Sequence, residues 1–182
     1  MEYESEHFQV RKLKEDDATS LFTEYCGSTP SAKYISTAPH LSVEATVSKI
    51  KQWCSAYDDV DARVQVYGVA DIVNDDVFGL MVFVFNQDYA EIHFGISDKM
   101  SHQGLATQLC LAGLEYLRRQ GVQEVRTHPY AGHHASIRVL EKSGFINHGT
   151  LLHHAPFPNL GSELFDCADM RIDLSNLAME GM

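Results

Sequence analysis

The alternation of apolar and polar residues predicts strands in several parts of the chain. Residues 8–14 alternate with period two, which is typical of a half-buried strand. Two runs rich in β-branched and aromatic residues, 63–72 and 77–85, flank the turn residues Asn74–Asp76 and predict a hairpin. Further strands are expected at Ala90–Ser97, 122–130, 148–154 and 164–174.

Apolar residues at helical spacing predict four helices. Acidic residues can cap a helix at the start of 16–27, and Ser42 can cap one within 41–57. A short helix over 134–145 ends at Gly144. The strongest pattern lies between Gly104 and Gln120, where one face carries Leu105, Leu109, Leu111, Leu114 and Leu117.

The order of these elements is β, α, α, β, β, β, α, β, α, β, β. That order predicts an α/β (α+β) architecture, with a mixed sheet of about seven strands and about four helices packed on it. It does not fit a repeating parallel βαβ series. With no linker or repeat, residues 1–182 are expected to form a single domain.

The chain is acidic, with a net charge of -11. Residues 1–100 hold 8 Lys and Arg against 17 Asp and Glu, a net of -9, so most of the acidity lies there. This excess argues against nucleic acid as a partner, and it favours solubility over a role in attracting a cationic substrate. No apolar run is long enough to span a bilayer, and four isolated cysteines suit a reducing compartment, so we expect a cytoplasmic protein without a membrane partner.

Gly104 stands where a helix is expected to begin, with the small residues Ala106 and Thr107 directly after it. Free N–H groups at a helix start bind anions, and a missing side chain lets a phosphate approach them. The segment has neither the lysine of a P-loop nor a GxGxxG pattern. Taken alone, the segment favours close packing at a helix start over an anion site.

A second segment changes that assessment. Together, ISDKMSHQGLAT (96–107) and HHASIRVLEKSGF (133–145) resemble the two signature segments of the GNAT acetyltransferases, in their order and spacing. The nearest branch is that of the ribosomal-protein N-terminal acetyltransferases. The resemblance implies the GNAT fold, with a sheet splayed at the cofactor-binding strand. It also implies acetyl-CoA as donor and a primary amine as acceptor, with a peptide α-amine favoured over a small amine.

The resemblance also carries over binding residues. The pyrophosphate of acetyl-CoA is expected on the loop amides, and the pantetheine and thioester on the strand before them, where the Ile96 N–H could bind an oxyanion. On the second segment, Ser136 matches the serine that faces the thiolate in this branch. The expected cofactor-binding residues are Phe94, Gly95, Ile96, Ser97, Gln103, Gly104, Leu105, Ala106, Thr107, His133 and Ser136.

Three residues depart from the family pattern. Ser101 replaces an arginine or glutamine, which removes one phosphate contact. His133 replaces an asparagine, although a neutral imidazole still donates one hydrogen bond. Leu140 replaces a tyrosine acid, which excludes that tyrosine mechanism and leaves Ser136 to assist the departing thiolate. These departures keep a non-catalytic acyl-CoA-binding or sensing module open as an alternative.

Glu91 is the candidate general base, because it begins the strand that leads to the cofactor loop, and His93 shares its face. An edge carboxylate paired with a surface cation, or a satisfied sheet histidine, would look the same in sequence. Asp166 could bind the acceptor amine or form a structural ion pair, and His153 or His154 could line the acceptor pocket.

We expect no metal, because the histidine pairs 133–134 and 153–154 lack the spacing of a metal site. A histidine-dependent metalloenzyme is the remaining, less favoured interpretation. The oligomeric state is open between monomer and homodimer.

Overall fold

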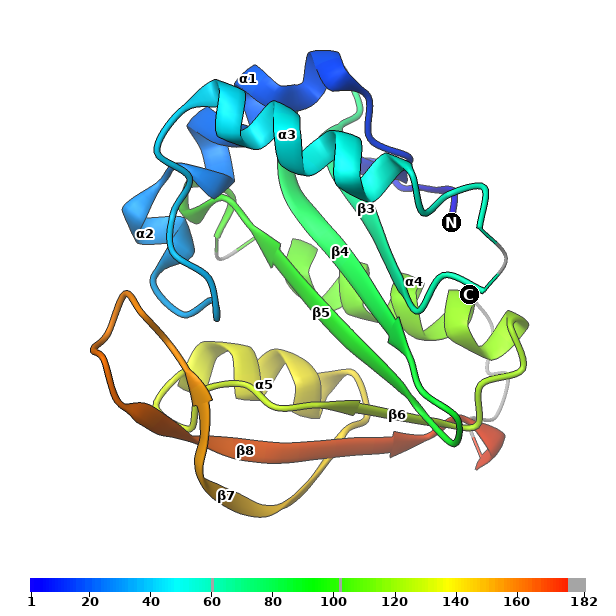
Figure 1. Ribbon diagram of the computed structural model, residues 1–182. Coiled ribbons are helices and arrows are strands. Elements are labelled where there is room, and N and C mark those ends of the chain that lie inside the picture. The colour runs from blue at the N-terminus through cyan, green and yellow to red at the C-terminus, as the bar shows by residue number, and fades with distance from the viewer. Residues whose placement is uncertain (60, 102, 177–182) are drawn as a thin grey trace.

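The computed structural model describes residues 1–59, 61–101 and 103–176, and the last six residues of the expected domain lie outside this range. Within it, eight strands form one mixed sheet in the order β1-β2-β3-β4-β5-β6-β8-β7 (Figure 1). The strands are β1 (Tyr3–Glu4), β2 (Phe8–Arg11), β3 (Val64–Asp71), β4 (Val77–Phe85), β5 (Ala90–Ile96), β6 (Glu124–Thr127), β7 (Ile146–Pro156) and β8 (Leu164–Asp173). The α-helices are α1 (Ala18–Leu21), α2 (Thr29–Ala32), α3 (Val43–Cys54), α4 (Leu105–Arg119) and α5 (His134–Lys142).

Two short elements account for the difference from the seven strands and four helices expected. The two-residue β1 pairs with β2 at the sheet edge. The single turn α2 lies in a segment rich in turn residues, and the Ser28 hydroxyl caps it by accepting a hydrogen bond from the Ser31 N–H at 3.5 Å. Neither element is long enough to show a hydrophobic period, and so sequence pattern misses both.

Helices cover the two faces of the sheet unequally (Figure 1). On one face, buried leucines of α4 such as Leu109 join Ile92 of β5 and Met170 of β8 in the larger core. On the other face, α1 and α3 bury Leu21 and Ile50 in a smaller core. Among the described residues, that smaller core draws its strand residues from β3 and β4 and none from β6 or β8.

The sheet parts between β5 and β6. These strands are parallel and pair only at Ala90 with Val125 and at Glu91 with Arg126, although β5 continues to Ile96. Figure 1 shows the two strands diverging towards the left of the view, where α2 lies above the gap and the start of α5 below it. The expected splay of the sheet at the cofactor-binding strand is therefore confirmed.

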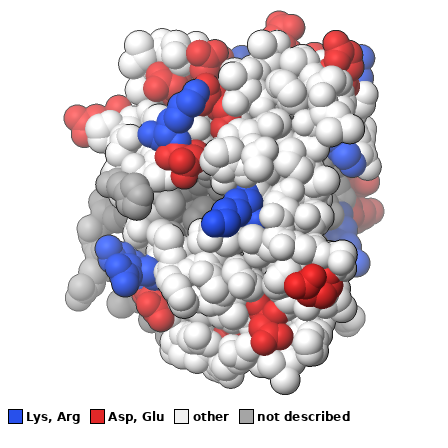
Figure 2. Space-filling model, turned by 90° about the vertical axis from the view of Figure 1, so that its left-hand side faces the viewer, with Lys and Arg blue, Asp and Glu red and all other residues white. Residues whose placement is uncertain are grey.

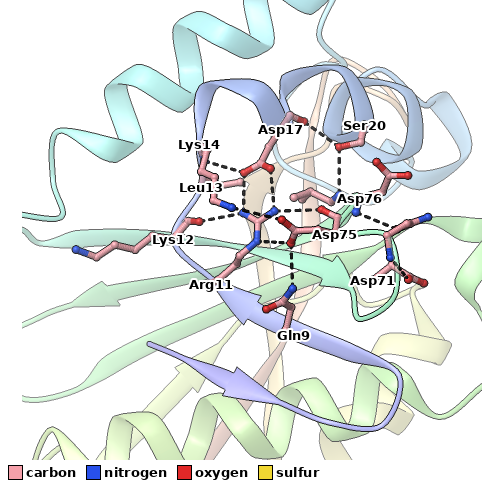
Figure 3. A network of polar contacts seen from close by, with 12 residues as sticks. Gln9, Arg11, Lys12, Leu13, Lys14, Asp17, Ser20, Asp71, Asp75 and Asp76 are labelled. Carbon is pink, nitrogen blue, oxygen red and sulfur yellow. Dashed lines mark hydrogen bonds and ion pairs between the residues drawn. The ribbon is translucent and has the colours of Figure 1, made fainter.

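A polar network ties the segment before α1 to the β3–β4 turn (Figure 3). The Arg11 guanidinium donates to both carboxylate oxygens of Asp17, each at 2.8 Å, and its Nε donates to Asp75 Oδ1 at 2.6 Å. Asp17 also accepts from the Lys14 N–H at 2.7 Å. Paired hydrogen bonds of this kind fix the angle at which the chain enters α1.

The chain from α1 continues without a break into a π-helical turn, Phe22–Cys26. Such turns change which side chains face the sheet. Here the turn directs Tyr25 onto β5 and buries Cys26 in the smaller core. In the residues covered by the structure, no helix is long and apolar enough to cross a membrane.

Candidate active site

The edge of β5 that faces the gap carries free backbone groups. The Ser97 N–H donates to the Phe78 carbonyl of β4 at 2.7 Å. In an antiparallel pair this bonding alternates along the strand, so the N–H groups of Phe94 and Ile96 point away from β4. Since β6 pairs with β5 no further than Glu91, these two N–H groups face the gap without a strand partner. One of these two groups is the Ile96 N–H, which the sequence analysis expects to bind an oxyanion.

The two neighbouring residues, Gly95 and Ser97, are used differently. Their backbone bonds run to β4, and the buried Ser97 side chain donates from Oγ to Glu24 Oε2 at 3.2 Å. Glu24 also accepts from Lys99 Nζ at 2.8 Å, so it joins the π-helical turn to the end of β5. Of the four strand residues expected to bind cofactor, Phe94 and Ile96 thus present backbone donors to the gap.

Packing against Tyr25 explains why residue 95 is a glycine. A β-carbon at this position would lie 2.0 Å from the Tyr25 hydroxyl oxygen, which is too close for two non-bonded atoms. The phenol therefore rests directly on the backbone of β5. Tyr25 is 6% exposed, and its burial raises the pKa of the phenol well above its ordinary value. The sequence gives no sign of this contact, because Tyr25 and Gly95 are far apart in the chain.

Gly104 begins α4 in the left-handed region, with φ of 79°, and an added β-carbon would meet no atom within 4 Å. Glycine is favoured there by the backbone itself. The Thr107 N–H bonds to the Gly104 carbonyl at 3.1 Å, whereas the first amides of a helix lack partners inside it. The amides of Gly104, Leu105 and Ala106 are therefore the ones open to an anion, with the exposed Gln103 beside them.

The start of α5 faces the segment that follows α2. The His133 ring stacks on the Tyr34 ring with centroids 4.1 Å apart, and burial lowers the pKa of His133 to about 4. Its imidazole is therefore neutral at pH 7. Ser136 lies in the first turn of α5, partly buried, and Leu140 is in the core at 1% exposed. The residue that replaces the family's tyrosine acid is thus a packing residue.

Glu91 and His93 form a pair on the face of β5 opposite the larger core. His93 Nε2 lies 3.1 Å from Glu91 Oε2, and Asn86 Nδ2 donates to Glu91 Oε1 at 3.3 Å. The hydrogen bond with His93 is the main reason that the pKa of Glu91 is lowered. Glu91 is therefore a carboxylate at neutral pH, as a base must be, and its partner is the histidine on the same face.

Sequence reasoning missed a second polar cluster across the gap. His128 Nε2 lies 3.6 Å from Asp169 Oδ1, and the His128 and His154 rings pack with centroids 4.9 Å apart. Asp169 is bound by Arg171 at 2.6 Å. Burial, followed by the nearby His154, lowers the pKa of His128. His128 directly follows β6 and alternates with Arg126, a pattern visible in the sequence, but its position beside β8 depends on a strand order that the sequence does not show.

His153 and Asp166 line a separate hollow of about 330 Å³ together with Tyr130, Ala131, Gly132, Leu164 and Phe165. His153 has a positive φ of 46°, and its N–H donates to Asp166 Oδ1 at 2.9 Å. The structure thus places one of the two expected acceptor-side histidines beside Asp166. It places the other, His154, against His128.

The face towards which the gap opens is mostly uncharged. Figure 2 shows isolated basic and acidic groups around a hollow near its centre, with no continuous basic patch. Across residues 1–59, 61–101 and 103–176, no group of three His, Cys, Asp or Glu side chains is placed to hold a metal ion.

A sheet parted beside free strand amides, with a glycine at the start of the following helix, is the arrangement that the resemblance to the GNAT acetyltransferases implies. The comparison with protein families identifies it further. The acetyltransferase (GNAT) domain matches residues 7–146, which is more than half of the chain, so the chain belongs to the GNAT acetyltransferase family. The family and fold expected from the sequence are confirmed, and the donor used by this family is acetyl-CoA.

Solved structures with the same fold cover nearly the whole chain. A GNAT-family acetyltransferase from Bacillus anthracis has a TM-score of 0.80 at 22% identity, over 97% of this chain and 100% of its own. The ribosomal-protein-S5-alanine acetyltransferase from Vibrio fischeri has a TM-score of 0.81 at 14% identity, over 98% and 99%. The spermidine N-acetyltransferase from Vibrio cholerae, in complex with CoA and spermine, has a TM-score of 0.76 at 17% identity, over 94% and 98%. No curated protein sequence matches the chain.

Proposed function

We propose that this protein transfers the acetyl group of acetyl-CoA to a primary amine, by direct attack of the amine on the thioester. The observation that carries the proposal is the gap between β5 and β6, where the N–H groups of Phe94 and Ile96 have no strand partner. Backbone donors in a fixed strand are well suited to an oxyanion, because they need no reorganisation when charge develops.

The residues present fit acetyl-CoA. The pyrophosphate is assigned to the amides of Gly104, Leu105 and Ala106, with Gln103 and Thr107 at its sides. The observation in favour is the open space over Gly104 at a helix start, where the helix dipole also attracts negative charge. When bound, acetyl-CoA supplies an activated acetyl group and a good leaving group.

Glu91 is assigned as the base that receives the proton of the amine, and the proton reaches it through His93 or a water molecule. Glu91 is five residues before Ile96, which is roughly 17 Å along an extended strand, too far for direct contact with a thioester at Ile96. His93 lies between them on the face of Glu91 and is hydrogen-bonded to it. A proton taken up by His93 can therefore be stabilised by a carboxylate that is already ionised.

A base of this kind favours an α-amine as acceptor. An α-amine, with a pKa of about 7.7–8.0, is roughly one tenth neutral at pH 7, whereas a lysine amine with a pKa of about 10.4 is neutral less than once in a thousand. Because the pKa of Glu91 is lowered, the pair is a weak base and suits the amine that needs less help. We therefore favour a peptide or protein N-terminus over a lysine side chain.

Ser136 is proposed to stabilise the departing thiolate. It lies in the first turn of α5, where the helix dipole also favours negative charge. A thiol with a pKa of about 8.5 leaves readily near neutral pH, so this role is less demanding than that of the base. A hydroxyl in place of the missing tyrosine is sufficient for it.

The test is release of free CoA thiol from acetyl-CoA with a panel of N-terminal peptides, polyamines and lysine derivatives, with acetylated products identified by mass spectrometry. We expect turnover with at least one α-amine and more slowly, if at all, with lysine derivatives. Saturable binding of acetyl-CoA without turnover on any acceptor would instead support the sensing module, which Ser101, His133 and Leu140 favour.

A further inference from the structure

The Tyr25 hydroxyl is a polar group with no partner among the residues that the structure describes. Every buried side-chain nitrogen or oxygen in that part of the chain has a hydrogen-bond partner. Because the Tyr25 hydroxyl has none, its oxygen must reach the surface, although the residue as a whole is only 6% exposed. A phenol buried to this degree and left unpartnered is a donor held ready for a ligand.

The position of this hydroxyl is fixed by its surroundings. The oxygen lies on Gly95, directly beside Ile96, whose N–H faces the gap. The π-helical turn that carries Tyr25 is held to the end of β5 because Glu24 accepts hydrogen bonds from Ser97 and Lys99. The absence of a side chain at Gly95 is what admits the phenol to the strand. The geometry thus brings a side-chain donor and a backbone donor to adjacent residues of one strand.

We propose that the Tyr25 hydroxyl donates a second hydrogen bond to the carbonyl oxygen of the thioester, beside the Ile96 N–H. This rests on the proposed function, because it requires the thioester to lie against β5. When the amine nitrogen bonds to the carbonyl carbon, the π electrons of the C=O bond move to the oxygen, where both donors stabilise them. They return as the carbon–sulfur bond breaks, and the thiolate leaves with that electron pair.

Tyr25 acts in this step as a donor and keeps its proton. Burial raises the pKa of the phenol above its ordinary value of about 10, whereas the leaving thiol has a pKa of about 8.5. Proton transfer from the phenol to the thiolate is therefore uphill, and so is ionisation of the phenol to serve as a base. Stabilisation of an oxyanion needs neither, which is why this role is assigned rather than that of the tyrosine acid found elsewhere in the family.

The first experiment compares Tyr25→Phe with Tyr57→Phe in steady-state acetyl transfer to the best α-amine acceptor. Removing one oxyanion donor lowers kcat by about 10²- to 10³-fold. We expect a fall in kcat of about that size for Tyr25→Phe, with the KM for acetyl-CoA within about twofold and no loss of Tm. The Tyr57 hydroxyl is bonded to Leu13 and Val66, so Tyr57→Phe should lower Tm and leave kcat unchanged.

The second experiment detects the hydrogen bond to the thioester carbonyl in the absence of an amine substrate. Difference infrared spectroscopy with acetyl-CoA labelled with ¹³C at the carbonyl reports the carbonyl stretch in the bound state. A hydrogen bond to the oxygen lowers this frequency, so we expect it to rise in Tyr25→Phe and in Gly95→Ala, whose new methyl group displaces the phenol. It should stay at the wild-type value in Tyr57→Phe.

The outcomes separate this inference from the proposed function. If the wild-type protein binds acetyl-CoA and turns over, but Tyr25→Phe leaves both kcat and the carbonyl frequency unchanged, then the role of Tyr25 is refuted and the proposed function stands. A shifted frequency in a protein that turns over no acceptor supports the donor and refutes the proposed transfer. If acetyl-CoA does not bind at all, both are refuted.

Discussion

Two hydrogen bonds fix the position of the Glu91 carboxylate on β5. Both carboxylate oxygens are occupied, one by Asn86 and the other by His93. Replacement by glutamine keeps the shape and an acceptor for Asn86, but it removes the charge that stabilises a protonated His93. The role of Glu91 can therefore be separated from its contribution to folding.

We expect Glu91→Gln to lower kcat/KM for α-amine acetylation by at least about tenfold, which is below the usual size of a general-base effect because His93 remains. The measurement is the pH–rate profile, in which the limb that reports the base should disappear. Glu6→Gln, at an exposed position, is the control and should leave the profile intact. A profile unchanged in Glu91→Gln would remove this residue from the mechanism.

His133 should make the stability of the fold depend on pH. Its pKa falls from an ordinary value of about 6.5 to about 4 in the folded chain, because the ring is buried against Tyr34. Between these values the unfolded chain binds a proton that the folded chain does not bind. The free energy of unfolding therefore declines as the pH falls from about 6.5 to 4, and is fully recovered above that range.

Urea unfolding at several pH values tests this expectation. His133→Phe keeps the stacking and removes the titration, so its free energy of unfolding should change less across this window than that of the wild type. His134→Phe replaces the exposed neighbour and should retain the wild-type slope. Equal slopes in wild type and His133→Phe would contradict the assignment.

Sequence pattern suggests candidate residues whose proposed role uses the backbone more readily than residues whose proposed role depends on a contact between distant segments. Gly104 could be proposed from sequence because its expected role depends on its place before a helical period, and Ile96 because it lies in the same segment. Tyr25 and His128 could not be proposed from sequence, because their contacts depend on which strands lie beneath or beside them. Gly95 was predicted as a cofactor residue, yet the reason for its glycine is a tyrosine seventy positions earlier.

At the scale of elements, the two ends of α4 offer a matched test of the anion site. Gly104 and Gly121 have φ of 79° and 82°, and a β-carbon at either would meet no atom within 4 Å. Alanine at either position should cost about 1 kcal/mol of stability through the left-handed backbone alone. Only Gly104→Ala places a methyl group where the pyrophosphate is assigned.

We therefore expect both variants to lose similar stability in urea unfolding. In calorimetric titration with acetyl-CoA, Gly104→Ala should bind about tenfold more weakly, equivalent to about 1.4 kcal/mol, while Gly121→Ala should bind like the wild type. Equal affinity in the two variants would show that the amides at the start of α4 do not hold the cofactor.

The network around Arg11 supports the element that carries Tyr25. The Arg11 side chain is 13% exposed and that of Asp17 8% exposed, so this ion pair is well shielded from water. Arg11→Met leaves the Asp17 charge without its partner, which typically costs about 3 kcal/mol for a buried pair. We expect a loss of this order in urea unfolding, and Asp17→Asn in the same background should restore part of it. A loss below about 1 kcal/mol would show that the pair contributes no more than a surface one.

Across the whole molecule, the elements that could be predicted are those whose apolar residues repeat with the period of a strand or a helix. The hairpin at Asn74–Asp76, the helix after Gly104 and the mixed character of the sheet all followed from the pattern. The position of β6 between β5 and β8 did not, because strand order depends on long-range packing. The polar cluster at His128 exists only because of that order.

The parted sheet also predicts a response of the whole molecule to its donor. Two residue pairs join β5 to β6, so a ligand between these strands connects the two parts of the sheet. Acetyl-CoA at about 100 times its Kd should stabilise the fold by about 2.7 kcal/mol, which raises the Tm by about 5–10 °C for a chain of this size. Differential scanning calorimetry with and without acetyl-CoA tests this. An unchanged Tm at saturating concentration would contradict binding to the folded chain.

The pyrophosphate site proposed at Gly104 would be formed by backbone amides, which affects how binding of acetyl-CoA responds to pH. Main-chain amides do not titrate, and the side chain of Ser101 is uncharged. Affinity for acetyl-CoA should therefore stay level between about pH 7 and 9, while the rate of transfer rises as the α-amine loses its proton. If the site proposed at Gly104 holds the donor, a change in pH should therefore alter the rate of acetyl transfer without altering how much of the protein is bound to acetyl-CoA.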